Sequence, residues 1–307
     1  MKVNVDKARK AFYLLLRRCK ENLLPIDCQI ELFTKCIEPI LMYGCELWGY
    51  EDSNIIEKFR LQCLKIILHA KSCTPNYMLY GELGLRPLES EIKKRMISFW
   101  MKLINNGEGK LSRLMYDLML FEYSSGEPSK WLKFVNEILE HTGNAYMWRD
   151  QRNITKLKIN QVKQVIEDQS IQKISDACSQ SNKGRNYLVL KEKWKIEPYF
   201  NLLDQYAAHN IFKYRTANHR LPVETGRFAN IEYRERICQE CKNDIGDEYH
   251  YLLSCPKFAS ERKKYLDKKH YKRPSMEIYK NIMCTEDQSL LKNTSLLVNI
   301  IIKTIKT

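Results

Sequence analysis

A short segment near the C-terminal end of this 307-residue chain holds three cysteines and a histidine at spacings typical of a metal site. Cys238 and Cys241 are separated by two residues, so a tight turn can direct both sulfurs at one ion. His250 follows after eight residues and Cys255 after four more, a spacing that a short helix or turn can present on one side. We therefore predict that these four residues bind one metal ion.

The ligand types predict the identity and the role of that ion. Soft thiolates with one imidazole favour zinc over hard cations such as magnesium and calcium. Protein ligands fill all four positions of a tetrahedral shell, so the Zn²⁺ is expected to be structural and not catalytic. Gly246 and several polar turn-forming residues lie between the two ligand pairs, as a chain reversal requires. The alternative is a chance cluster of reduced cysteines.

The remaining cysteines show no comparable grouping. The chain has eleven cysteines in total, and those outside the motif are scattered, which predicts free thiols in a reducing compartment. No stretch approaches the roughly 20 apolar residues of a membrane span, and the N-terminal segment lacks a cleavable signal pattern. We expect an intracellular protein with no membrane partner; nucleus and cytoplasm both remain open.

Apolar residues recur at helical spacing, which predicts a mainly α fold. The clearest series runs from Leu88 to Leu103 in steps of four and three and stops before an Asn-Asn-Gly turn. Pro39 should kink or end an earlier helix that starts near Ile26. A further helix is expected over about 198–215, followed by a break in regular structure caused by Pro222 and Gly226. Short strands are expected only near the cysteine motif.

Two polar, glycine-containing segments, at 123–130 and 178–186, predict boundaries in the chain. We expect a helical thumb-like region over 1–125, a helical connecting region over 126–225, and a zinc-knuckle and basic C-terminal region over 226–307. The names of the first and last regions rest on the resemblance described below.

The formal net charge of +14 favours an anionic partner, nucleic acid in the first place. Basic residues flank the cysteine motif on both sides and alternate with aromatic residues, which suits phosphate contacts and base stacking. A basic face that is merely solvated is the alternative. The expected phosphate contacts are Arg234, Arg236, Lys257, Arg262, Lys263 and Lys264, and the expected stacking residues are Tyr233 and Phe258.

The segment from Glu235 to Phe258, with its Glu248-x-His250 step and its Cys255-Pro256 ending, resembles the zinc-binding tail of LINE-type, non-LTR retrotransposon reverse transcriptases. The pattern Tyr43-Gly44-x-Glu46-x-Trp48 resembles a segment just beyond the polymerase palm in jockey-like elements. The stretches at 74–89 and 218–228 also resemble sequences of those elements. The resemblance implies that nearly the whole chain corresponds to the thumb-like and C-terminal portion of such an enzyme.

The catalytic signatures of that family are missing from this sequence. A polymerase needs paired carboxylates for two metal ions, and no Asp-Asp pair occurs. The resemblance implies that palm, fingers and endonuclease would lie upstream of Met1, and the segment after Phe258 lacks a nuclease pattern. No phosphate-binding glycine loop and no hydrolase or zinc-protease motif occurs either. We expect no enzyme activity, no catalytic residue and no small-molecule substrate.

The sequence therefore predicts a non-catalytic protein that binds RNA, an RNA–DNA junction or single-stranded nucleic acid, with a structural zinc. Two alternatives stay open. One is a protein-interaction module in which the zinc is purely structural. The other is an accessory subunit that requires a polymerase-bearing chain in trans. A decayed reading frame without selected activity is also compatible with one sequence.

Overall fold

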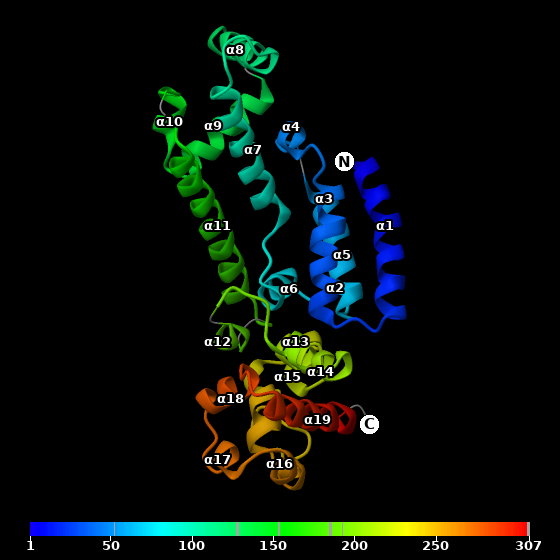
Figure 1. The fold of residues 1–307 in the computed structure, drawn as a ribbon. Coiled ribbons are helices and arrows are strands. Elements are labelled where there is room, and N and C mark those ends of the chain that lie inside the picture. Colours follow the sequence, from blue (N-terminus) through cyan, green and yellow to red (C-terminus); the bar gives the residue numbers. More distant parts are fainter. Residues whose placement is uncertain (52, 127–128, 153, 184–185, 192, 306–307) are drawn as a thin grey trace. The chain divides into compact units, whose positions relative to one another are not determined.

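The computed structural model describes residues 1–307 except 52, 127–128, 153, 184–185, 192 and 306–307. Its described residues form helices and connecting turns, which confirms the predicted mainly α class (Figure 1). They contain no β-strand; Ile237 and Ile245 make an isolated antiparallel bridge beside the cysteine motif. None of the described helices is long and apolar enough to cross a membrane.

The chain forms two compact units, each assembled from separate segments. Unit 1 comprises Met1–Leu15, Phe33–Leu61 and Arg86–Ile174. Unit 2 comprises Leu16–Leu32, Gln62–Leu85 and Ser175–Thr307 and carries the whole cysteine motif. The three-region division expected from the sequence stays a prediction.

The helices of the chain are named in order as follows. The first part contains α1 (Lys2–Glu21), α2 (Ile26–Leu32), the π-helical η1 (Phe33–Ile37), α3 (Glu38–Leu41), α4 (Cys45–Trp48), α5 (Asn54–Ile67), α6 (Asn76–Leu83), α7 (Leu88–Ile104) and α8 (Leu111–Ser124). The middle part contains α9 (Lys130–His141), α10 (Ala145–Arg149), α11 (Lys156–Ser179), α12 (Tyr187–Leu190), α13 (Tyr199–Leu202), α14 (Gln205–Arg215) and α15 (Pro222–Phe228). The last part contains the 3₁₀ turns η2 (Tyr233–Glu235) and η4 (Pro256–Phe258), the π-helical η3 (His250–Ser254), α16 (Ala259–Tyr265), α17 (Lys268–Tyr271), α18 (Met276–Met283) and α19 (Gln288–Thr304).

The strongest sequence pattern gives the central helix of unit 1. Leu88, Ile92, Met96 and Leu103 are all buried on α7, and the helix ends at Ile104, before the predicted turn. Helix α7 packs against α4, α8 and α9. Its Trp100 donates a hydrogen bond from Nε1 to the hydroxyl of Tyr116 on α8, at 2.8 Å. The apolar stripe is therefore core, as its spacing predicts.

Three of the helices differ from those expected from the sequence. The helix starting at Ile26 passes through a π-helical turn at η1 before Pro39 enters the first turn of α3, so proline and π-bulge together interrupt it. The helix expected over 198–215 is divided into α13 and α14, because the Asp204 side chain accepts from the Ala207 amide and starts a new helix. The break expected at Pro222 is instead helix α15, with this proline in its first turn.

In unit 2, helix α14 packs along α19 (Figure 1) and carries a fully buried arginine. Arg215 lies 3.0 Å from carboxylate oxygens of both Glu82 and Glu197. It also donates from Nη1 to the carbonyl of Met283 at 2.9 Å. From its place on α14, this one cation thus connects α6, the end of α18 and the segment that precedes α13. The free-energy cost of removing it from water is offset by two carboxylates and a carbonyl.

Removing this cation leaves two buried carboxylates uncompensated. We expect Arg215→Met to lower the free energy of unfolding by about 3–5 kcal/mol, the usual cost of removing one partner from a buried ion pair. Urea denaturation followed by circular dichroism measures the change. The matched control is Arg17→Met, whose partner Glu21 is exposed, and which should cost less than about 0.5 kcal/mol. Equal effects of the two substitutions would contradict this account.

His209 on α14 gives unit 2 a pH dependence. Burial lowers its pKa to about 4, with Lys213 and His69 adding to the shift. In the unfolded chain an imidazole titrates near 6.5, so the unfolded state binds more protons as pH falls from about 6.5 to 4, and stability falls with it. We expect His209→Asn to reduce the drop in urea midpoint between pH 7 and pH 5 relative to the unmodified protein.

The control for this measurement is His141→Asn, a substitution of an exposed histidine. It should leave the drop unchanged. Any metal lost at low pH affects all three proteins alike, so the difference between them isolates His209. Superimposable pH profiles for His209→Asn and the unmodified protein would disprove the assignment.

Candidate metal centre

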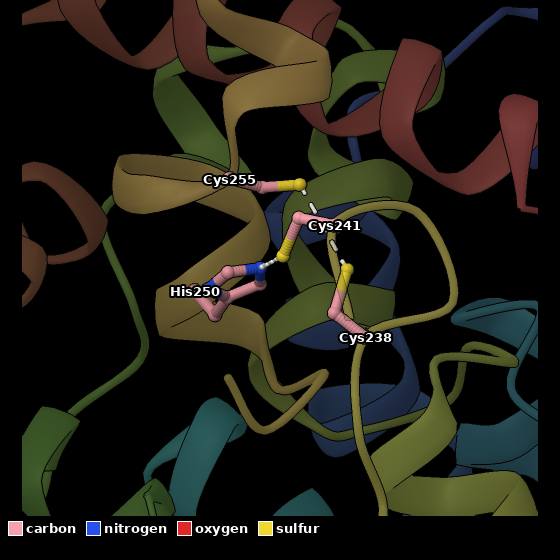
Figure 2. A group of neighbouring side chains, drawn as sticks. All are labelled: Cys238, Cys241, His250 and Cys255. Carbon is pink, nitrogen blue, oxygen red and sulfur yellow. Dashed lines mark hydrogen bonds between the residues drawn. The ribbon is translucent and has the colours of Figure 1, made fainter. Parts of the chain in front are cut away.

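The side chains of Cys238, Cys241, His250 and Cys255 converge on one point in unit 2 (Figure 2). Their ligand atoms all lie within 4.8 Å of one another. The Sγ atoms of Cys238 and Cys255 are 3.8 Å apart, and Cys241 Sγ is 3.3 Å from His250 Nε2. The four residues could therefore hold a metal ion, as their spacing in the sequence predicts.

A tight hairpin positions the first two ligands. The amide of Cys238 donates to the carbonyl of Asp244 at 2.7 Å, and the amide of Gly246 donates to the carbonyl of Arg236 at 2.9 Å. Lys242, directly after Cys241, reverses the chain in the left-handed region with φ of 57°. The expected strand character around the motif is therefore limited to one bridge and its hydrogen bonds.

The other two ligands come from a single π-helical turn. The amide of Cys255 donates to the carbonyl of His250 at 2.8 Å, so both side chains face the same side of η3. Asp247 Oδ1 accepts from the His250 amide at 2.8 Å and caps the start of the turn. Asp244 Oδ2 lies 3.5 Å from His250 Nδ1, which leaves Nε2 as the nitrogen directed at the cluster. An outer carboxylate of this kind orients many metal-bound histidines.

The separations fit a tetrahedral ion with sulfur and nitrogen ligands. With Zn–S bonds of about 2.3 Å and Zn–N bonds of about 2.0–2.1 Å, a tetrahedral shell places two sulfurs about 3.8 Å apart and a sulfur and a nitrogen about 3.5 Å apart. The Cys238–Cys255 separation of 3.8 Å matches the first of these edges, and the Cys241–His250 separation of 3.3 Å is slightly shorter than the second. The sulfurs of Cys238 and Cys255 are too far apart for a disulfide, whose S–S bond is about 2.05 Å, and both cysteines are free.

The surroundings of the sulfurs differ, and this affects their ionisation. Burial opposes ionisation of Cys238, but the Tyr251 hydroxyl and the amides of Cys241 and Glu240 outweigh it and hold the pKa of this thiol below its usual value. Burial raises the pKa of Cys255 to about 12, and the neighbouring Cys238 adds to the increase. A bound cation would supply the positive charge that permits several adjacent thiolates.

A buried carboxylate fixes the segment between the ligand pairs to the rest of unit 2. Glu248 accepts from His219 Nε2 at 2.9 Å and from Asn186 Nδ2 at 3.0 Å. Its carbonyl accepts from the Tyr214 hydroxyl on α14 at 2.7 Å. Burial opposes the charge on Glu248, but the contact with His219 keeps its carboxyl pKa below the usual value. His219, itself buried, therefore has a structural contact here.

The structure separates the predicted nucleic-acid contacts into surface and interior residues. Arg234, Lys257, Lys263 and Lys264 are exposed, and Tyr233 is half-buried. Arg236 is also half-buried, and it donates from Nε to the carbonyl of Ile231 and from Nη1 to that of Val223, both at 3.0 Å. Its guanidinium is thus occupied in holding two turns together.

Two of the predicted contacts are wrong. Phe258 is 2% exposed and packs edge-to-face on Tyr251, so no base can stack on it. Arg262 is buried and donates to the carbonyls of Leu252 and Cys255, at 2.8 and 2.9 Å. It therefore satisfies the end of the π-helical turn that carries two ligands. Both errors arise because a residue's position in a basic segment does not tell which face of its helix is buried.

The most exposed aromatic residue of the basic segment before the motif was not among the predicted contacts. Phe228, at the end of α15, is 68% exposed, and the guanidinium carbon of Arg227 lies 4.3 Å from its ring centroid. The signal in the sequence was its position directly after Arg227 in the basic segment before the motif.

Comparisons with protein-family models, curated proteins and solved structures gave no match to this chain. The site is therefore interpreted from its own residues.

Occupancy of the centre is directly measurable. We expect the purified chain to bind one zinc ion, and Cys238→Ser to weaken zinc binding by at least about 100-fold, beyond the 10–100-fold typical for loss of an outer partner. Competition with a chromophoric chelator measures the affinity, and metal analysis gives the stoichiometry. The control is Cys73→Ser, an exposed cysteine outside the cluster, which should retain full affinity. Equal zinc affinities in the two variants would contradict the assignment.

Proposed function

We propose that this chain is a non-catalytic nucleic-acid-binding protein, with RNA or an RNA–DNA junction as the preferred ligand and a structural zinc at the cysteine–histidine cluster. The proposal rests on one observation above the others. Basic side chains of the segments that flank the four clustered ligand residues remain exposed, and the same unit carries an exposed aromatic ring beside an arginine.

The ligand set supports a structural role for the zinc. Cys238, His250 and Cys255 are buried, and Cys241 completes four protein ligands. Four protein ligands leave no coordination position for water or substrate, which a catalytic zinc requires. The ion would cross-link the hairpin to the π-helical turn, and would thereby hold the residues around both in one arrangement.

The charges around the cluster support a phosphate-rich ligand. The exposed basic residues of this part of unit 2 are Arg220, Arg234, Lys242, Lys257, Lys263, Lys264, Lys268, Lys269, Lys272 and Arg273. Two of them have a carboxylate nearby: the Nζ of Lys257 lies 3.6 Å from Glu240, and the Nζ of Lys269 lies 3.8 Å from Asp267. Such an excess of exposed cations attracts a polyanion and releases its counterions on binding.

The aromatic side chains favour an unpaired strand over a duplex. Phe228 with its stacked Arg227 replaces Phe258 as the principal stacking residue, and Tyr233 lies under Arg236, with 5.9 Å between guanidinium carbon and ring centroid. Bases that are not paired can stack on such rings, whereas a duplex hides its base faces.

The similarity to LINE-type reverse transcriptases remains part of the proposal. The Tyr43–Trp48 motif forms a local turn in which Gly44 has φ of 70°, a region that favours glycine, and Trp48 Nε1 donates to the Tyr43 carbonyl at 3.0 Å. The Glu46 carbonyl accepts from Trp131 at 2.7 Å. These contacts give the motif a role in folding unit 1.

Binding is tested by fluorescence anisotropy of a labelled 20-nucleotide single-stranded RNA with the zinc-loaded protein over a range of salt concentrations. We expect affinity to fall steeply with salt, by a slope of about −0.7 per phosphate contact. Combined Lys263→Ala and Lys264→Ala substitutions should make the slope shallower by about one unit. Phe228→Ala should weaken binding by about 1–3 kcal/mol with an unchanged slope, because it removes stacking and no charge.

The matched control uses a similar pair in unit 1. Lys158 Nζ lies 5.8 Å from the ring centroid of the exposed Tyr146, so Tyr146→Ala should leave RNA affinity unchanged. Absence of RNA binding at low salt would overturn the proposal. Salt-insensitive capture of an acidic protein would then favour an interaction module. Copurification with a chain that carries an Asp-Asp polymerase motif would favour an accessory subunit.

A further inference from the structure

Helix α8 belongs to unit 1 and presents an apolar stripe to solvent, far in sequence from the cysteine–histidine cluster. The stripe consists of five side chains that are each at least 50% exposed: Leu111, Leu114, Met115, Leu118 and Phe121. They recur at steps of three and four, so they lie on one side of the helix. Isolated exposed apolar residues need no explanation, but a continuous helical face of them indicates an interaction surface.

The opposite side of α8 is held firmly on unit 1. The Tyr116 hydroxyl accepts from Trp100 at 2.8 Å and donates to Gln151 Oε1 at 2.7 Å. Arg113 donates from Nη1 to the carbonyl of Ile104 at the end of α7. These contacts on the inner face fix the rotation of the helix, so the stripe cannot turn inward without breaking them.

The charges of α8 exclude the partners that suit the rest of this basic chain. The helix carries one arginine, one aspartate and one glutamate, although the whole chain has a net charge of +14. Arg113 Nε lies 2.9 Å from Asp117 Oδ1, so these two side chains largely neutralise each other. Nucleic acid and anionic membranes favour several free basic residues around such a stripe, whereas α8 offers Arg113, which is paired with Asp117, and the N-cap residue Lys110.

We propose that this stripe is a self-association surface, in which α8 pairs antiparallel with α8 of a second copy of the chain. In heptad terms Leu111 and Leu118 occupy position a, and Leu114 and Phe121 occupy position d. An antiparallel pair stacks a residues on d residues of the other helix. Leu111 then meets Phe121 of the second copy, and Leu114 meets Leu118, with Met115 beside them.

The flanking charges select the antiparallel orientation. In a parallel pair, position g of one helix faces the following position e of the other, which would place Asp117 beside Glu122 of the second copy. Two such like-charge contacts would form. In the antiparallel pair, positions g face each other, which brings the two copies of Asp117 together. This is one like-charge contact instead of two, and each Asp117 keeps its own Arg113 as a counter-charge at 2.9 Å.

The area of the stripe matches a weak dimer. Burying five side chains of this size and exposure would remove on the order of 500 Å² from each copy, or about 1,000 Å² in total, which is near the lower bound of specific interfaces. We expect a dimer with a dissociation constant in the micromolar range. This dimer does not depend on the proposed nucleic-acid binding, because none of its residues belongs to that surface.

Sedimentation velocity on the zinc-loaded, reduced full chain over about 1–100 µM tests the inference. The sedimentation coefficient should rise from monomer to dimer with concentration. Leu114→Glu and Leu118→Lys, each alone, should weaken dimerisation by at least about 30-fold, as expected for a charge in the centre of an interface. The matched control is Leu157→Glu, a 69% exposed leucine on α11, which should dimerise like the unmodified chain.

Mixing the two stripe variants tests the orientation. In the antiparallel pair position 114 of one chain faces position 118 of the other, so Leu114→Glu and Leu118→Lys chains together bring a carboxylate against an ammonium. In the other central layer, Leu114 of the Leu118→Lys chain still packs against Leu118 of the Leu114→Glu chain. An equimolar mixture should therefore recover dimerisation to within about 10-fold of the unmodified chain. A parallel pair would align identical positions and show no recovery.

Three outcomes would overturn the inference. A concentration-independent monomer would exclude self-association. A dimer insensitive to both stripe substitutions would place the interface elsewhere. A monomer that floats with neutral phosphatidylcholine vesicles, and loses this behaviour in Leu114→Glu, would identify the stripe as a membrane-contact surface instead. Circular dichroism of each variant shows that the helices are retained.

Discussion

Unit 2 depends on the burial of a single guanidinium group. Arg215 has no exposed side-chain surface, and it is surrounded by Glu82, Glu197 and the carbonyl of Met283. Segments far apart in sequence must assemble at once to compensate this charge, because any one missing partner leaves an ion in a low-dielectric interior. The neighbouring Tyr214 on the same helix bonds the carbonyl of Glu248. Adjacent residues of α14 thus connect the buried charges to the metal cluster.

The metal cluster illustrates how a module with little regular structure acquires rigidity. Its hairpin and its π-helical turn contain few repeating hydrogen bonds, and three cysteines face one another in a buried space. Without a cation the buried Cys255 thiol resists ionisation, because burial and the neighbouring Cys238 raise its pKa. The four residues could hold a divalent ion, which would supply the opposing charge and join the two elements. Arg262 and Glu248 then hold the same elements through backbone carbonyls and a buried histidine.

The two candidate interaction surfaces differ in charge and in polarity. Around the cluster, exposed lysines and arginines accompany Phe228, a combination that attracts a polyanion and offers a stacking face. On α8, the charges nearly cancel and the exposed side chains are apolar, a combination that favours another protein surface. A self-paired α8 would give two basic surfaces per assembly and raise the local concentration of binding sites for one strand.

The sequence by itself determined the features that depend on spacing along the chain. The four ligands of the cluster, the helix at Leu88–Ile104 and the helical class all follow from local periodicity or from short intervals. Only the tertiary structure decided which side chains of a segment are buried. Arg262 and Phe258 are buried, whereas Lys263 and Lys257 of the same basic segment are exposed. The division of one expected helix at Asp204 and the free face of α8 were decided there too. The physical reason is that burial and capping depend on which distant segments pack against a residue, whereas ligand spacing and helical period are properties of the chain itself.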